Sequence, residues 1–474
     1  MSSIKPIHWI TVGLGLCVIV YILHYHLQYF GNVSFLGGIL MLEILIASVW
    51  KYSQRFLPLL MIAFLWASMT VPLQSAWTSG RWGVLMVGAG VGFIAWTRNP
   101  RSTFGSLHLI AFFCVCAAFV SATVSQYVEM ATLKALSLLL LFLYCGSGAR
   151  LAMLGRERQF FNGLLWATEG LVYVTAICYF VFGANIWGNP NSLGAAMAVG
   201  AFPVLLWGWR NSDGPIENLR RLIALLVCAY LIRFSMARAG MVAALVVTTV
   251  FCLCLRQYKL LVKMAAVVLF FVAISGMLAP ETLSDQISQL EDAFLYKGHK
   301  QDGLLGSRKS PWENSIASIK EHPMFGTGYG TSPTGEDPGF TFGTTSSSAE
   351  TEREHGSSYV TIAEWVGLVG VLPFIALLGL TLLNLRRACS TMLKTADPSH
   401  YSIPLAMVML AGLVHANFED WLFAVGSYLS VLFWIFAFLL ADALPAADSL
   451  PVRRVNPLRV LSRPVSFGPV ASKQ

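Results

Sequence analysis

Charged residues are scarce in this sequence of 474 residues. Asp, Glu, Lys and Arg make up only 12% of it, against about 25% in an ordinary soluble domain. Hydrophobic residues make up 56%, and apolar runs of roughly 17 to 25 residues recur along nearly the whole chain. Helices of that length cross a hydrocarbon core of about 30 Å. The scarcity of charge therefore excludes an ordinary soluble enzyme and predicts an all-α, polytopic integral membrane protein.

Lys and Arg are nearly absent from every second connection between the apolar runs. We count about 14 runs, some of them short, and expect about 12 to 14 transmembrane helices. If the N-terminus is cytoplasmic, the basic residues gather in the inside connections, for example at 150–158, 210–221 and 386–394, and in the C-terminal tail. This placement in a lipid bilayer accounts for the net charge of +8 without nucleic acid as a partner.

The cysteines give no sign of an external disulfide framework, because all nine lie in or beside apolar runs. Each Cys-x-Cys pair, at 114/116 and 252/254, places its two thiols on different helix faces, so no metal site is expected. No cleaved signal peptide is expected either. The first apolar run lacks a small-residue processing site, and other apolar runs follow it.

One long polar segment interrupts the apolar runs, between about Pro280 and Glu354. It holds twelve acidic and six basic residues, and the alternation of spans places it outside the membrane. A loop of this length in a compact protein is usually functional or disordered. We therefore expect four regions: transmembrane helices in 1–279, a loop capping the active site in 280–355, further transmembrane helices in 356–443 and a basic cytoplasmic tail in 444–474.

The outer loop is expected to be partly helical. Residues 281–296 space their apolar side chains at helix intervals. A second helix is predicted from Pro311, which suits a first helical turn, with Trp312, Ile316 and Ile319 on one face and Pro323 ending it. An extended turn is predicted at Gly326, Gly328 and Gly330, followed by a Gly/Thr/Ser-rich stretch.

Two arginines on the outer side are candidates for binding an anion. Arg238, in "RFSMARAGMVAAL", lies between two apolar runs, where a charge is costly and is usually retained for function. Arg308 opens the amphipathic part of the outer loop. The alternative interpretations are a side chain that snorkels to the interface for Arg238 and a solvated one for Arg308. Arg233 adds charge nearby or pairs with an acid such as Glu169.

His355 lies where the acidic loop turns into the next apolar run, and Ser357 or Ser358 is placed to cap the helix that follows. A helix N-terminus disfavours the imidazolium, so the imidazole is expected to stay neutral at pH 7, as a general base requires. The acids at 350, 352 and 354 oppose this expectation by favouring the cation. The alternative is a structural loop histidine.

Another outside turn, "NIWGNPNSLGAAM", places Asn191 beside the start of an apolar run, where its amide can donate to a phosphate or a sugar. A plain Asn-Pro turn with a helix cap is the alternative. Glu419 and Asp420 lie in the last outside turn, either as surface residues or as partners of the arginines.

Taken together, the arginines and the histidine lie on one side of the membrane, under the outer loop. Two guanidinium groups suit a pyrophosphate, because each makes paired planar contacts with phosphoryl oxygens. A neutral histidine beside them would deprotonate a sugar hydroxyl. This set predicts glycosyl transfer from a lipid pyrophosphate with no metal and no other cofactor.

At these residues the sequence resembles the bacterial O-antigen ligase and O-antigen polymerase superfamily of polytopic glycosyltransferases. The family has a Ser-x-Ser-Arg-Gly-like turn, then an outer loop with Gly-x-Arg, a Trp and Pro-x-x-Gly-x-Gly-x-Gly, then a histidine before a helix rich in Glu and Gly. The matching stretches here are "SMARAG", "GSRKSPW", "HPMFGTGYG" and "HGSSYVTIAEWVGLVG". The resemblance covers about residues 185 to 385. This sequence departs from the family pattern in having Gly356, and not Asn, after His355.

The resemblance implies an inverting, metal-independent glycosyltransferase in the bacterial inner (cytoplasmic) membrane, with its active site facing the periplasm. Arg238 and Arg308 would bind the pyrophosphate of an undecaprenyl-linked glycan donor, and His355 would activate the acceptor hydroxyl. Asn191, Trp312 and Tyr359 are candidate substrate contacts. The acceptor glycan would be a lipid-linked repeat unit for a polymerase or lipid A core for a ligase.

Three alternatives remain open at this point. Polymerase, ligase and protein-glycosylating relatives share these motifs. We slightly favour an O-antigen or exopolysaccharide polymerase, because "HANFEDWLFAVGSYLSVLFW" is similar in general character to members from exopolysaccharide clusters. A flippase or transporter of the lipid-linked glycan would bind the same donor without making a bond. An amino-acid or ion transporter would be supported by paired broken helices at the membrane midplane, and the sequence shows no convincing pair.

Overall fold

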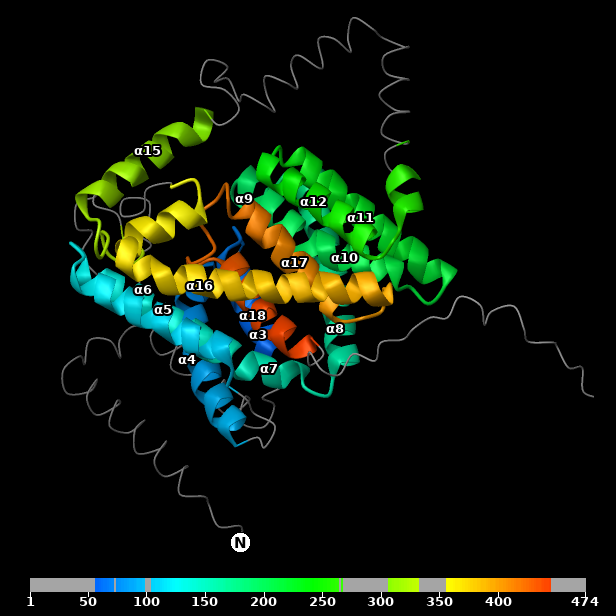
Figure 1. Ribbon diagram of the computed structural model, residues 1–474. Helices are drawn as coiled ribbons and strands as arrows, with labels where there is room; N and C mark the ends of the chain where they lie inside the picture. The colour runs from blue at the N-terminus through cyan, green and yellow to red at the C-terminus, as the bar shows by residue number, and fades with distance from the viewer. Residues whose placement is uncertain are drawn as a thin grey trace, which may run out of the picture.

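The computed structural model describes residues 56–71, 74–98, 104–263, 266, 306–331 and 355–444. Within these ranges all regular structure is helical (Figure 1), which confirms the all-α prediction. The apolar runs before residue 56, the helix predicted over 281–296, the Gly/Thr/Ser-rich stretch and the basic tail lie outside the described residues. The same holds for the acids at 350, 352 and 354.

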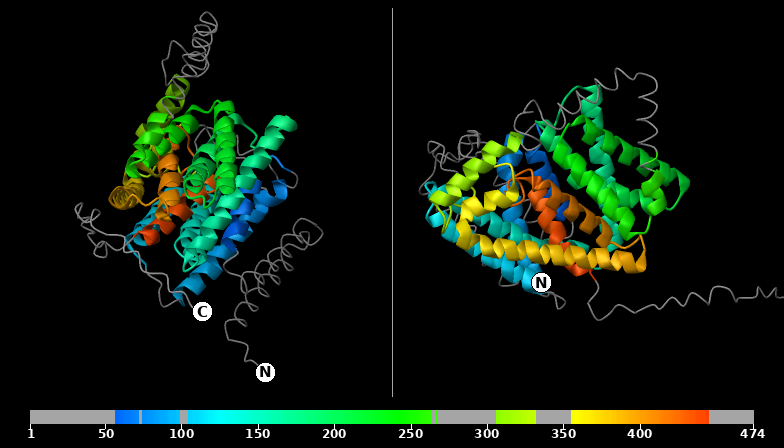
Figure 2. Two further views of the ribbon diagram at one scale, coloured as in Figure 1. Left: turned by 90° about the vertical axis from the view of Figure 1, so that its right-hand side faces the viewer. Right: turned by 45° about the horizontal axis from the view of Figure 1, so that its top comes forward.

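The helices form one bundle, in which segments far apart in sequence lie side by side (Figures 1 and 2). In chain order they are α3 (Phe56–Ala67), α4 (Gln74–Thr97), α5 (Ser106–Thr123), α6 (Val128–Cys145), α7 (Gly148–Met153), α8 (Glu157–Ala176), η3 (Ile177–Val181), α9 (Pro190–Ala195), η4 (Ala196–Ala201), α10 (Phe202–Arg210), α11 (Pro215–Phe234), α12 (Arg238–Cys254), α15 (Gly306–Glu321), α16 (Ser358–Thr395), α17 (Ser402–His415) and α18 (Tyr428–Ala443).

Five helical segments are long and apolar enough to cross a membrane: Ser106–Thr123, Val128–Met153, Glu157–Val181, Pro190–Arg210 and Ser358–Thr395. Four shorter apolar helices accompany them: Phe56–Ala67, Arg238–Cys254, Ser402–His415 and Tyr428–Ala443. The chain is therefore a polytopic membrane protein. The expected total of about 12 to 14 spans includes runs outside the described ranges.

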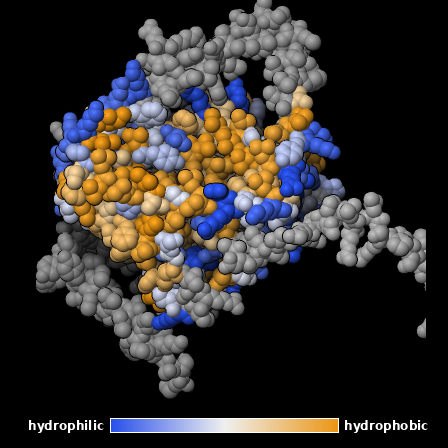
Figure 3. Space-filling model, viewed as in Figure 1, coloured by the Kyte–Doolittle hydropathy of each residue, from blue (hydrophilic) through white to orange (hydrophobic). Residues whose placement is uncertain are grey.

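The outer surface of α16 is apolar, as a bilayer-facing helix requires. Figure 3 shows hydrophobic side chains over much of the face seen in Figure 1. Exposed apolar residues on this helix are Leu368, Val369, Leu372, Ile375, Leu382, Leu383 and Leu393. Side chains with this exposure would be unfavourable in water but are stable against lipid.

Helix α16 is broken at Gly367, whose φ of 67° and ψ of 179° are not helical (Figure 1). The break exposes backbone groups on both sides, and the loop Pro323–Thr331 pairs with them. Thr327 N donates to Glu364 O at 3.0 Å, and Leu368 N donates to Pro323 O at 2.8 Å. The loop thus supplies the hydrogen bonds that an unbroken helix would have made within itself.

The glycines of this loop are needed for its close approach to α16. Gly326 has a φ of 75°, and a Cβ atom there would overlap the carbonyl oxygen of Trp365. The loop is held from other sides as well. Lys134 Nζ on α6 donates to Gly330 O at 2.6 Å, and the Tyr329 hydroxyl donates to Phe423 O at 2.8 Å. The expected extended turn is therefore a fixed plug in the broken helix.

Helix α15 confirms the predicted helix in the outer loop but differs from the prediction in two respects. It begins at Gly306, so Pro311 lies inside it and not in its first turn. Its buried face centres on Ser315 and Ser318, while Ile316 is 47% exposed. The predicted apolar face is wrong at Ile316, because α15 lies alongside α16 (Figures 1 and 2) with Ser315 and Ser318 buried and Ile316 turned outward.

Candidate active site around His355

His355 lies between two carboxylates that are distant from it in sequence. Its side chain is 2% exposed, with Nδ1 3.2 Å from Asp420 Oδ2 and Nε2 3.5 Å from Glu364 Oε1. The backbone N–H of His355 also donates to Asp420 Oδ2 at 3.2 Å. Glu364 is fully buried, whereas the Asp420 side chain is 34% exposed. Both ring nitrogens therefore face carboxylate oxygens.

This arrangement corrects the expectation of a neutral imidazole. Burial lowers the pKa of His355, but the hydrogen bonds to Asp420 and Glu364 and their negative charges outweigh burial and raise that pKa to about 9. In turn, burial of Asp420 raises its pKa, and the hydrogen bonds and charge of His355 outweigh this and lower it. The imidazole is therefore protonated at neutral pH in the free site. The helix N-terminus is a weaker influence than two adjacent carboxylates.

The loop that carries Asp420 is attached to the start of α16 through Ser358. Ser358 Oγ donates to Glu419 O at 2.6 Å and accepts from Leu422 N at 3.0 Å. Ser357 is the N-cap residue of α16, as predicted, but its side chain makes no capping hydrogen bond. The serine pair thus fixes the 416–422 loop beside His355, and it does so through tertiary contacts that the capping pattern did not predict.

Arg238 is the first residue of α12, directly after the turn Ser235–Ala237. Ser235 Oγ donates to Ile232 O at 2.6 Å and accepts from Ala237 N at 3.2 Å, and Met236 has a φ of 52°. The turn lies against α9, where a Cβ atom on Gly194 would overlap Ala237. Arg238 is half-buried and has an interaction partner.

Asn191 is the second residue of α9 and is half-buried. The Asn-Pro turn is also a helix cap, but Asn189 makes it: its side-chain oxygen accepts from Ser192 N at 2.7 Å. The structure therefore shows the capping alternative at Asn189. Asn191 lies in the first turn of α9, and α9 is a neighbour of α12, which begins at Arg238.

The other predicted site residues lie on α15 and α16. Arg308 is the third residue of α15; its side chain lies outside the described residues. Trp312 is half-buried, and its Nε1–H is buried without a hydrogen-bond partner among the described residues. The Tyr359 hydroxyl donates to Leu413 O at 2.9 Å, so this group already fastens α16 to α17.

The loop 416–427 adjoins two parts of the candidate site. At its start, Ala416 O accepts from Ser358 N at 2.9 Å, close after His355, and its end lies beside the start of α9. The rings of Trp187, just before α9, and Tyr428, just after the loop, have centroids 5.4 Å apart. Sequence reasoning missed Arg81 on α4, whose Nη1 donates to Gly426 O at 2.8 Å. A lone arginine within an apolar run was the available signal.

Of the two alternatives for Arg233, the pairing with Glu169 is not what the structure shows. Arg233 is exposed, and its Nη1 lies 2.9 Å from the sulfur of Met236. Glu169 instead pairs with Arg220 at 3.0 Å and lies 3.9 Å from Arg221. Both of these arginines are in the first half of α11, away from the turn that precedes Arg238.

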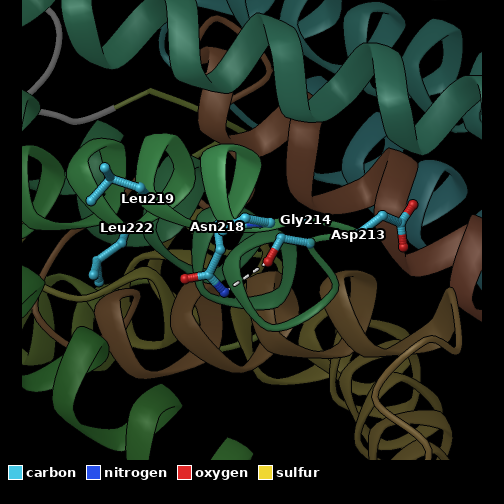
Figure 4. A pocket seen from close by; sticks show the side chains of 7 residues that line it. Asp213, Gly214, Asn218, Leu219 and Leu222 are labelled. Atoms are coloured by element: carbon cyan, nitrogen blue, oxygen red, sulfur yellow. Dashed lines mark hydrogen bonds between the residues drawn. The ribbon is translucent and has the colours of Figure 1, made fainter.

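An open pocket of about 500 Å³ lies at the start of α11, lined by Ser212, Asp213, Gly214, Pro215, Asn218, Leu219 and Leu222 (Figure 4). Asn218 Nδ2 donates to Ser212 Oγ at 2.8 Å across it. Leu222 is the last pocket residue on α11, and the twelve residues from there to Phe234 put about 18 Å of helix between the pocket and the Arg238 turn. In the part of the chain that the structure describes, no group of three or more His, Cys, Asp or Glu residues is placed to hold a metal ion.

Comparison with known families supports the sequence resemblance. Residues 222–375 match the family model described as O-antigen ligase. The match includes Arg238, Arg308, His355 and Glu364, and it ends before Asp420. No curated protein matches the chain. The match confirms the resemblance to the O-antigen ligase and polymerase superfamily, which supports an activity of the glycosyltransferase type.

Proposed function

We propose that this chain, which carries an O-antigen ligase domain in residues 222–375, transfers a glycan from an undecaprenyl-pyrophosphate carrier to a sugar hydroxyl. The transfer is inverting, requires no metal and takes place on the periplasmic side of the bacterial inner membrane. The acceptor oxygen forms a bond to the anomeric carbon, and the bond from that carbon to the pyrophosphate breaks. The carrier leaves as undecaprenyl pyrophosphate, and the hydroxyl proton passes to Nε2 of His355, the ring nitrogen with the longer carboxylate contact, 3.5 Å to Glu364.

The observation that carries this proposal is the enclosure of His355 by Asp420 and Glu364. The carboxylates stabilise the imidazolium that forms when the hydroxyl proton arrives, and they orient the ring. The carboxylates also reduce the fraction of His355 that is neutral and able to accept a proton. With a pKa of about 9, only about 1% of the free enzyme has a neutral imidazole at pH 7. His355 is therefore a strong base that is mostly protonated until the pH approaches 9.

The two arginines supply the anion-binding part of the proposal. Arg238 and Arg308 both lie in the first turn of a helix, α12 and α15 respectively. A cation at a helix N-terminus is unfavourable by itself, whereas an anion is stabilised there by the free N–H groups. An arginine in that position adds charged, paired donors beside those N–H groups, and the pyrophosphate of the donor would fit such a set of donors. Asn191 and Trp312 would add neutral donors.

We favour a polymerase, in which the acceptor is the next lipid-linked repeat unit. A ligase would use lipid A core. The break in α16 does not favour an ion or amino-acid transporter. Transporters leave unwound backbone open to line a substrate cavity, whereas here the loop Pro323–Thr331 fills the break at Gly367.

The test is turnover of a lipid pyrophosphate-linked repeat unit by the purified full chain, with products separated by length. We expect a ladder of products from the wild type and none from His355→Ala. A single discrete product that requires an added acceptor would indicate a ligase. Absence of turnover with either acceptor would refute the enzyme and favour a flippase.

Matched arginine variants test the pyrophosphate site. Arg238→Ala and Arg308→Ala should abolish transfer while leaving expression intact. The controls are the neighbouring cations Arg233→Ala and Lys309→Ala, which lie on exposed positions and should transfer at the wild-type rate. Near-normal transfer by Arg238→Ala or Arg308→Ala would refute the role of that arginine.

A further inference from the structure

Trp365 has a buried indole N–H with no hydrogen-bond acceptor in the part of the chain that the structure describes. The residue is 6% exposed, and its Nε1–H has no hydrogen-bond partner among the described residues. Nearly all buried N–H groups in folded proteins are paired, because an unpaired one has lost its hydrogen bond to water without replacement. An indole in this position is therefore a candidate for donation to a ligand.

The position of Trp365 is fixed by its backbone. Its carbonyl oxygen accepts from Ser121 Oγ at 2.5 Å and from Gly328 N at 3.1 Å. Its ring packs edge-on against two others, with centroids 5.9 Å from His355 and 5.5 Å from Tyr329. The indole is thus held directly beside the proposed catalytic base, and it cannot turn toward another acceptor without breaking these contacts.

The chemistry around Trp365 indicates which ligand its N–H would meet. Glu364 and Asp420 flank His355, and two carboxylates disfavour a further anion such as a pyrophosphate. A neutral sugar suits the same place. Its hydroxyl hydrogens can donate to the carboxylates, and its oxygens can accept from an indole N–H. Aromatic rings also offer an apolar surface with a polar edge, which matches the two kinds of surface on a sugar.

We propose that Trp365 binds the acceptor sugar, by donating its Nε1–H to an acceptor oxygen next to the hydroxyl that His355 activates. This inference rests on the proposed function. Trp365 is a positioning and specificity residue in this scheme, since it contacts substrate but transfers no proton. Removing its N–H should weaken binding of the acceptor and leave binding of the donor unchanged.

The test replaces Trp365 by benzothienylalanine, which keeps the shape of the two rings and has sulfur in place of the N–H. Trp365→Phe serves as a second, genetically encoded variant. The matched control is the same pair of replacements at Trp96, another buried tryptophan with an unpaired Nε1–H. Trp96 lies under Arg150, at 4.1 Å from its Cζ, and Arg150 pairs with Asp442 near the far end of α18.

Two quantities are measured on the full chain. One is the dissociation constant for the repeat-unit oligosaccharide cleaved from the cell's own lipid-linked donor. The other is the dissociation constant for undecaprenyl pyrophosphate. The benzothienylalanine variant at Trp365 should bind the oligosaccharide about 3- to 10-fold more weakly, the effect of one lost hydrogen bond, with unchanged pyrophosphate binding. The melting temperature should not fall, because no internal hydrogen bond is removed. In the transfer assay, the KM for acceptor should rise by a similar factor.

Unchanged oligosaccharide binding at Trp365, or an equal loss at Trp96, would overturn the inference. So would a loss confined to pyrophosphate binding, which would place the N–H at the donor. Wild-type protein that binds no oligosaccharide would overturn it as well. If the wild type binds the oligosaccharide but transfers nothing, the proposed function fails while the binding comparison still decides the role of Trp365.

Discussion

The pH dependence of transfer should be set by Asp420 through His355. In the wild type the pKa of His355 is raised from 6.5 to about 9. This change corresponds to about 3 kcal/mol of preference for the imidazolium. His355 is almost fully buried, so solvent does not screen the interaction appreciably. If His355 is the general base, kcat/KM should rise with pH, reach half its maximum near pH 9 and level off above that pH.

Asp420→Asn removes one of the two charges but keeps a side chain of the same shape. The amide oxygen can still accept from His355, so the ring should stay in place. The pKa of His355 should fall by at least about 1 unit, or about 1.4 kcal/mol, because Asp420 supplies the larger of the two hydrogen-bond contributions. The midpoint of the pH profile should move down by the same amount. The rate at the plateau should fall, because a weaker base takes the proton less readily.

The same pair predicts how stability depends on pH. A histidine whose pKa is raised by folding stabilises the folded protein below its unfolded pKa, and this stabilisation is lost as pH rises through the folded value. The wild type should therefore lose melting temperature between about pH 7 and pH 10, and Asp420→Asn should lose less. A profile midpoint that stays near pH 9 in Asp420→Asn, or transfer that falls as pH rises toward 9, would refute the assignment of His355 as the base.

Three further variants test the framework around the site. Gly367→Ala should lower the free energy of unfolding by about 1 to 3 kcal/mol and reduce transfer, because its φ of 67° with ψ of 179° is nearly exclusive to glycine. The control is Gly379→Ala in the same helix, which has open space around it and should be neutral or stabilising. Equal melting temperatures for the two variants would contradict the requirement for glycine at the break in α16. Tyr359→Phe should cost about 1 kcal/mol of stability and leave the acceptor KM unchanged, since its hydroxyl bonds the backbone. A raised KM would make it a substrate contact. Lys134→Met should slow transfer and lower the melting temperature, as it frees the carbonyl of Gly330; wild-type values would show that this bond does not hold the loop.

The sequence predicted the residue types of the site better than their partners. His355 could be placed before a helix from the chain alone, and acids near it could be named. The acids that set its pKa are Glu364, nine residues later in α16, and Asp420, whose loop is held beside His355 by the hydrogen bonds of Ser358. Tertiary contacts of this kind leave no periodic pattern in the sequence, so the protonation state could not be predicted.

Glycine spacing shows the same limit. The run of Gly326, Gly328 and Gly330 predicted an extended turn, and in the structure all three glycines have the positive φ that such a turn uses. The sequence did not predict that this turn packs into a break in α16 at Gly367, about forty residues later. An isolated glycine in an apolar run has the same pattern as an ordinary helical residue. Likewise, Ser315 and Ser318 form the buried face of α15 because close helix packing favours small side chains over the larger Ile316.

The loop Pro323–Thr331, which fills the break in α16, is held by residues from outside the family-matched segment. Residues 222–375 contain His355 and both arginines, yet much of what holds them lies elsewhere in the chain. Ser121 and Lys134 come from before this segment, and Asp420 comes after it. A fragment limited to the family-matched residues would therefore have the reactive side chains without the architecture that arranges them. We therefore expect the smallest active unit to be the assembled membrane domain. Transplanting the matched segment into another scaffold would carry over the reactive side chains but not the contacts that position them.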